Sequence, residues 1–145
     1  MNLHATCVAI GDCGVLMRGP SGSGKSDLAL RLIDQYADAV LVSDDQVDVT
    51  ALDGALYAAA PAAIAGRMEV RGVGIVTVDY RPRVRLGLVV DLQEDTHIPR
   101  LPEPECAEIM GICLPLLRLA PFAASAPAKL RLALRLHSVP EQDRA

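Results

Sequence analysis

Eight consecutive residues near the N-terminus are of the types that bind a phosphate chain: Gly19-Pro20-Ser21-Gly22-Ser23-Gly24-Lys25-Ser26. They fit the template G-x-x-x-x-G-K-[ST] at every fixed position. The glycines let the backbone turn tightly and direct successive N–H groups at one anion, and a following helix adds the positive end of its dipole. Lys25 would then bridge the terminal phosphates of a nucleotide, and Ser26 would bind magnesium. The alternative is a surface turn that holds a lysine.

A pair of acids is the second candidate for chemistry. The apolar run 39–43 reads as a buried strand and ends in Asp44-Asp45. In phosphate-loop enzymes an acid at such a strand end lies beside the metal, and a second acid can serve as base or orient a nucleophile. Asp91, which ends the run Leu88-Val89-Val90, competes for this role. Two solvated acids at a strand end are the other interpretation.

Both candidates need a strand–loop–helix unit to position them. The run 15–17 predicts the strand, and a stripe at helical spacing predicts the helix: Leu28, Ala29, Leu32, Ile33 and Tyr36. The segment Leu3 to Ile10 predicts an earlier strand that turns through 11–14. His4 lies early in it, where composition alone favours a structural or surface role.

The later segments complete a mainly β pattern. An Asp53-Gly54 pair indicates a hairpin. The two glycines within 67–79 indicate either a strand with a bulge or a close approach to a ligand or another chain. The loop at 93–104 is expected to be mobile and contains His97 and Arg100. We expect the remaining elements as follows: strands at 46–50, 55–59, 84–92 and 112–119, a short helix at 105–110, a helix at 125–137 and a frayed tail from Pro140.

Composition bounds the fold class. The 145 residues suit one domain, and with one Phe, three Tyr and no Trp the core must be built from Leu, Val, Ile and Ala. Such a core is typical of a parallel sheet covered by helices. Together with the segments above, it predicts an α/β fold with a mainly β core flanked by helices. We expect this domain to span residues 1–140, with residues 141–145 as its tail.

Charge and cysteine usage exclude several classes of function. A net charge of −4 argues against nonspecific nucleic-acid binding. The four cysteines show no C-x-x-C spacing, which argues against a zinc site. Neither a signal segment nor a membrane-spanning run is evident, so the expected location is cytoplasmic.

Taken together, the phosphate loop, the Asp-Asp-x-Val-Asp run at 44–48 and the Glu-x-Arg-Gly-x-Gly-Ile run at 69–75 resemble the catalytic domain of HPr kinase/phosphorylase. That bacterial family uses ATP to phosphorylate a serine of HPr, a small phosphocarrier protein of the sugar phosphotransferase system. The resemblance covers Leu3 to about Pro121. It implies Mg²⁺ as cofactor, HPr as partner and, by analogy with the family, a hexamer.

The resemblance also assigns roles. His4 matches the family's active-site histidine, and Lys25 matches its phosphate-loop lysine. Ser26 and Glu69 match the magnesium ligands. Asp44 and Asp45 match the acidic pair; we favour Asp45 as the proton acceptor, because the first acid is better placed to hold metal-bound water.

Two further regions bear on activity. Arg100 resembles an arginine that reaches the transferred phosphoryl group. Residues 121–126 stand where the family has a proline-and-arginine motif that is linked to removing phosphate from HPr. These residues contain no arginine. The resemblance therefore implies kinase activity and leaves open whether the chain also has phosphorylase activity. The alternatives are a small-metabolite kinase, which should carry an arginine-rich lid, and a non-catalytic nucleotide-binding regulator, which should lack the base.

Overall fold

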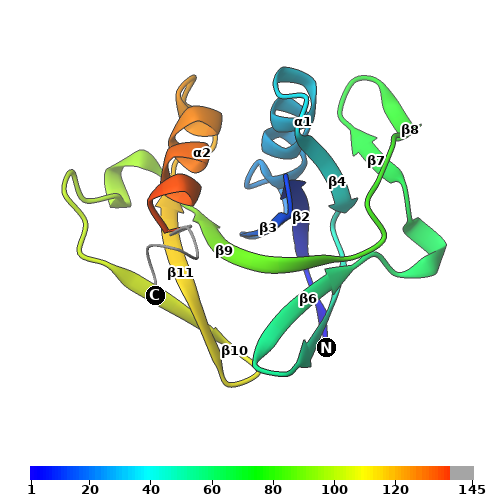
Figure 1. Cartoon of the computed structure of the whole chain (residues 1–145). Helices are drawn as coiled ribbons and strands as arrows, with labels where there is room; N and C mark the ends of the chain where they lie inside the picture. The colour runs from blue at the N-terminus through cyan, green and yellow to red at the C-terminus, as the bar shows by residue number, and fades with distance from the viewer. Residues whose placement is uncertain (138–145) are drawn as a thin grey trace.

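The fold is built on one large mixed sheet (Figure 1). The computed structural model describes residues 1–137, so the expected tail at 141–145 lies outside the described residues. Within 1–137 the sheet has nine strands in the order β1-β5-β6-β9-β3-β2-β4, with β11 pairing with β9 and carrying β10. Their bounds are β1 (Asn2–Leu3), β2 (Ala5–Ile10), β3 (Cys13–Arg18), β4 (Ala39–Ser43), β5 (Val47–Leu52), β6 (Ala55–Ala59), β9 (Val84–Leu92), β10 (Glu105–Ile109) and β11 (Ile112–Leu119).

The centre of the sheet is parallel. Strand β9 runs parallel to β3 on one side and to β11 on the other, whereas β2 pairs antiparallel with both β3 and β4. Every residue of β2 is buried, as are the four inner residues of β3. These strands therefore read as continuous apolar runs, because both of their faces are covered.

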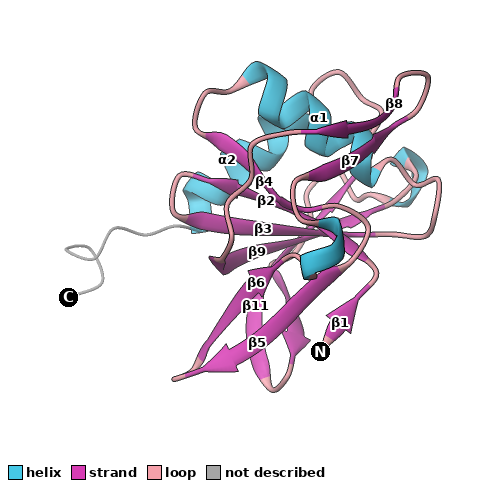
Figure 2. Ribbon diagram, turned by 90° about the vertical axis from the view of Figure 1, so that its right-hand side faces the viewer, coloured by secondary structure: helices cyan, strands magenta, loops and turns pink. Residues whose placement is uncertain are grey.

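Two helices cover one face of the sheet: α1 (Lys25–Gln35) and α2 (Ala126–His137). Leu28 and Leu32 of α1 and Leu130 of α2 pack on this face against inward side chains of β2, β3 and β9. The opposite face is closed by the sheet's own outer strands, with Val49, Leu56 and Ile109 in a second core (Figure 2). This arrangement confirms the expected α/β fold with a mainly β core and flanking helices.

A separate hairpin stands beside α1. It consists of β7 (Arg67–Val70) and β8 (Gly74–Thr77), which pair only with each other among the described strands. Gly72 has a φ of +87° and the Val73 N–H donates to the Val70 carbonyl at 2.9 Å. The expectation of one bulged strand over 67–79 is therefore wrong, because the glycine closes a turn and reverses the chain.

Two other local predictions are corrected. Residues 105–110 form no helix, because Met110 (φ +51°) and Gly111 (φ +79°) make a two-residue turn that pairs β10 with β11. The strand expected over 3–10 is broken at His4, since β1 pairs with β5 while β2 pairs with β3 and β4.

Several other predictions are confirmed. Asp53 and Gly54 form the expected hairpin turn, with φ of +51° and +77°. Helix α2 lies where the 125–137 segment predicted one. Short 3₁₀ turns occur at Ala62–Ile64 and, inside the expected 93–104 loop, at Asp95–His97.

Neither helix of the described chain has the length and apolar character needed to cross a bilayer.

Leu28→Ala should lower the free energy of unfolding by about 2–5 kcal/mol, because it opens a cavity between α1 and the sheet. Leu28 is fully buried, whereas Leu136 on α2 is 70% exposed. Leu136→Ala, the matched control, should change stability by less than about 0.5 kcal/mol. Urea unfolding checks both variants; equal losses would contradict this packing of α1.

Candidate functional site

The glycine-rich loop joins the end of β3 to the start of α1. Gly22 and Gly24 have φ of +81° and +99°, a left-handed conformation that favours glycine. The Leu28 N–H already donates to the Gly24 carbonyl at 2.9 Å, so the helix starts directly from the loop. Free N–H groups at the first turn and the helix dipole therefore face the loop, which is the geometry of an anion site.

Lys25 is the cation of this loop. Its Nζ donates to the carbonyls of Gly19 at 2.6 Å and Pro20 at 3.1 Å, and the side chain is buried. Burial lowers the pKa of Lys25, and the nearby charges of Asp45 and Asp44 oppose that shift. The loop thus holds a positive charge at its centre, close to two carboxylates.

Asp44 is buried and accepts three hydrogen bonds from three different elements. Its Oδ1 accepts from the Thr6 hydroxyl of β2 at 3.1 Å and from the Ser26 hydroxyl of α1 at 2.6 Å. Its Oδ2 accepts from the Glu69 N–H of β7 at 3.3 Å. This carboxylate therefore fixes the strand end, the loop helix and the hairpin relative to one another.

Asp45 points the other way. Its φ of +69° turns the backbone, and its side chain is 62% exposed. The Asp45 N–H donates to the Thr6 hydroxyl oxygen at 3.2 Å, and the Ala5 N–H donates to the Asp45 carbonyl at 3.1 Å. The backbone is thus held by β2 while the carboxylate stays accessible.

His4 links this acid to the loop. Its Nδ1 lies 3.3 Å from Oδ1 of Asp45, and its Nε2 lies 3.4 Å from Oγ of Ser21. The break in the first strand brings the imidazole here. An imidazole ring and an exposed carboxylate are therefore in contact at the rim of the loop.

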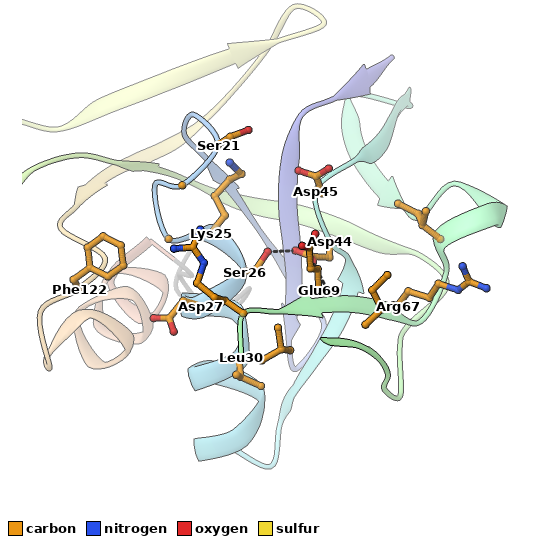
Figure 3. A pocket seen from close by; sticks show the side chains of 16 residues that line it. Ser21, Lys25, Ser26, Asp27, Leu30, Asp44, Asp45, Arg67, Glu69 and Phe122 are labelled. Carbon is orange, nitrogen blue, oxygen red and sulfur yellow. Dashed lines mark hydrogen bonds between the residues drawn. The ribbon is translucent and has the colours of Figure 1, made fainter. Parts of the chain in front are cut away.

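A pocket of about 720 Å³ opens over these groups (Figure 3). The loop and the acids form one wall, and the β7–β8 hairpin forms another. The residues that line it are Ser21, Gly22, Gly24, Lys25, Ser26, Asp27, Leu30, Asp44, Asp45, Ile64, Arg67, Glu69, Val70, Arg71, Ile75 and Phe122.

The structure gathers most of the sequence-predicted residues at this pocket. Glu69 lines it, and His4 reaches it through Asp45. Arg100 is exposed and does not line it. Asp91 is engaged elsewhere, because Arg18 binds its two oxygens at 2.7 and 3.0 Å.

Sequence reasoning assigned no site role to several residues that the structure places at or beside the pocket. Arg67 and Glu69 lie on the exposed face of β7 and alternate with buried Met68, which was a readable signal, and Arg71 directly follows the strand. Phe122 lines the pocket from the segment before α2. Thr6 gave no signal, since a threonine in a buried strand is ordinary until its partner is known.

The fold and the site define an α/β protein in which a glycine-rich loop at a helix N-terminus lies beside two consecutive acids with opposite exposure. The model of the HPr serine kinase C-terminal domain matches residues 1–120, and the chain belongs to this family.

Curated relatives and a solved structure agree with this family. HPr kinase/phosphorylases of Clostridium beijerinckii and Clostridium tetani are 43% and 42% identical over 76 residues. The match covers 52% of this chain and 24% of each relative, so the matched segment spans about a quarter of the relatives' length. The HPr(Ser) kinase/phosphatase structure from Coxiella burnetii superposes with a TM-score of 0.83 at 26% identity, covering 94% of this chain and 95% of that one.

Asp44→Asn should lower the free energy of unfolding by about 1–3 kcal/mol, because an amide NH₂ cannot accept from one of the three donors. Asp45→Asn should change it by less than about 0.5 kcal/mol, since the side chain is exposed and asparagine tolerates a positive φ. Urea unfolding of the two variants tests this contrast. Equal losses would show that the three hydrogen bonds of Asp44 do not stabilise the fold.

Proposed function

We propose that this chain transfers the γ-phosphoryl group of ATP to a serine hydroxyl of an HPr-type phosphocarrier protein. The observation that carries the proposal is the division between the two acids. Asp44 is buried against Ser26 at the loop, and Asp45 is exposed against His4 at the rim. One carboxylate is placed to organise the phosphate end, and the other is free to meet a nucleophile.

The nucleotide binds through the loop 19–26. Backbone N–H groups at the start of α1 and the amine of Lys25 receive the β and γ phosphates. Lys25 leaves the Gly19 and Pro20 carbonyls for this purpose, exchanging neutral acceptors for charged ones, which make stronger hydrogen bonds.

The residues present fit a magnesium ion. The Ser26 hydroxyl and the Asp44 carboxylate, whose oxygens are hydrogen-bonded at 2.6 Å, would hold it together with Glu69, which lines the same pocket. Mg²⁺ prefers oxygen donors and commonly takes one or two protein ligands beside phosphates and water. When bound, it would neutralise charge that develops on the phosphate oxygens.

The chemical step needs a proton acceptor, a role that we assign to Asp45. The serine oxygen bonds to the γ-phosphorus as the bond to the β-phosphate oxygen breaks, and the hydroxyl proton passes to the Asp45 carboxylate. ADP leaves with the bridging oxygen. His4, in contact with Asp45 and Ser21, orients the carboxylate toward the rim of the loop.

The partner and its setting follow from the family. The relatives are named as kinases and phosphorylases of HPr, which supports HPr as substrate for the domain-sized chain here. The hexamer implied by the family and a cytoplasmic location belong to the same proposal. All four cysteines of the described chain are free thiols, which supports a reducing compartment.

Lys25→Ala should reduce HPr phosphorylation by about a hundredfold or more, the order expected for losing one preorganised donor. The measurement is mass spectrometry of HPr after incubation with the protein and MgATP. The expected product of the unmodified chain is HPr with one added phosphate on serine.

The matched control is Lys129→Ala, which removes the chain's other lysine, exposed on α2. It should leave phosphorylation unchanged. If the chain binds ATP but HPr stays unphosphorylated, HPr is rejected as the partner and the nucleotide site is retained. If phosphate from labelled ATP appears on a metabolite instead, the chain is a small-molecule kinase.

Asp45→Asn should lower the turnover number by about 10²- to 10⁴-fold with little change in ATP affinity, because it removes only the proton acceptor. Asp53→Asn is the control, as Asp53 also has a positive φ (+51°) but lies in the β5–β6 turn. Steady-state kinetics with HPr and a separate ATP titration provide both readouts. Unchanged turnover in the Asp45 variant would reject the base assignment.

A further inference from the structure

Phe122 is an exposed aromatic ring beside the glycine-rich loop. It is the chain's single phenylalanine, and its side chain is 70% exposed. A Cβ built on Gly24 would lie 3.0 Å from two carbons of the ring, so the ring edge packs on the loop backbone. The remaining surface of the ring is open to solvent.

Arg31 of α1 fixes the backbone on both sides of this ring. Its guanidinium donates to the carbonyl of Pro121 and to that of Ala123, the latter at 3.3 Å. Asp27, one helical turn earlier, holds the same guanidinium at 3.0 Å. The ring is therefore attached to the helix that begins at the loop, and its exposure is not that of a loose loop tip.

The ring of Phe122 lies at the end of the pocket opposite Asp44 and Asp45 (Figure 3). In Figure 3, Lys25 and Ser26 lie between Phe122 on one side and Asp44 and Asp45 on the other. Phe122 lines both the main pocket and a neighbouring one of about 280 Å³. A phosphate chain that runs along the loop past Lys25, with its terminal group facing Asp45, has its other end on the side of Phe122 (Figure 3).

We propose that Phe122 is the stacking platform for the nucleobase of the nucleotide bound at the loop. The proposal rests on the proposed function, because it takes the direction of the phosphate chain from Asp45. Stacking uses the π face that every base offers, so the platform adds affinity and tolerates different bases. A phosphate chain without a base gains nothing from it.

Phe122→Ala should weaken ATP binding by about 5- to 100-fold, the range measured when one stacked aromatic is removed. Inorganic tripolyphosphate, which has the phosphates and no base, should bind the variant and the unmodified chain alike. Phe122→Tyr should retain the affinity for ATP. Isothermal titration in the presence of Mg²⁺ measures all three proteins.

A spectroscopic test uses the absence of tryptophan from the chain. In the Phe122→Trp variant, ATP should quench the indole fluorescence and tripolyphosphate should not. Leu101→Trp is the control, since Leu101 is 81% exposed and does not line the pocket. Its fluorescence should respond to neither ligand.

The outcomes separate this inference from the proposed function. Equal ATP affinity in the Phe122→Ala variant and the unmodified chain would overturn the platform alone. Equal loss of ATP and tripolyphosphate in that variant would also overturn it, because the ring would then only support the loop. Failure of the unmodified chain to bind either ligand would overturn the nucleotide site, and the platform with it.

Discussion

The site depends on one buried carboxylate. Asp44 accepts hydrogen bonds from Thr6, Ser26 and the Glu69 N–H, which belong to a strand, the loop helix and the hairpin. A buried carboxylate is tolerated only where donors replace its water, so these three elements must stay in register to supply the hydrogen bonds that Asp44 accepts. The requirement that keeps the carboxylate stable is therefore the same one that assembles the pocket wall.

Two neighbouring acids acquire opposite environments through the backbone. Extended strands place consecutive side chains on opposite faces, but Leu41, Val42 and Ser43 at the end of β4 are all buried, so both faces of the strand are covered there. The positive φ of Asp45 takes the chain out of the strand and points the second carboxylate to solvent. Thr6 holds that conformation by donating to Asp44 and accepting from the Asp45 N–H. A single hydroxyl thus supports both roles.

The walls of the pocket come from segments far apart in the chain. The β7–β8 hairpin contributes Arg67, Glu69 and Arg71 on one side, and the segment before α2 contributes Phe122 on another. Each is tied to α1: the hairpin through Asp44 and Ser26, and the Phe122 segment through Arg31. Helix α1 therefore links the glycine-rich loop, Asp44 and the segment that contains Phe122.

The sequence by itself determined the loop, the acidic pair and the α/β class, because these follow from local spacing, dipoles and apolar runs. The sequence pattern wrongly predicted a helix at 105–110, because strand pairing with β11 overrides the helix propensity of these residues. It also missed Thr6, Arg67, Arg71 and Phe122 as site residues. Only the tertiary structure decided which acid is buried, what His4 touches and where Phe122 stands. Contacts between residues that are distant in sequence leave no periodicity in the chain.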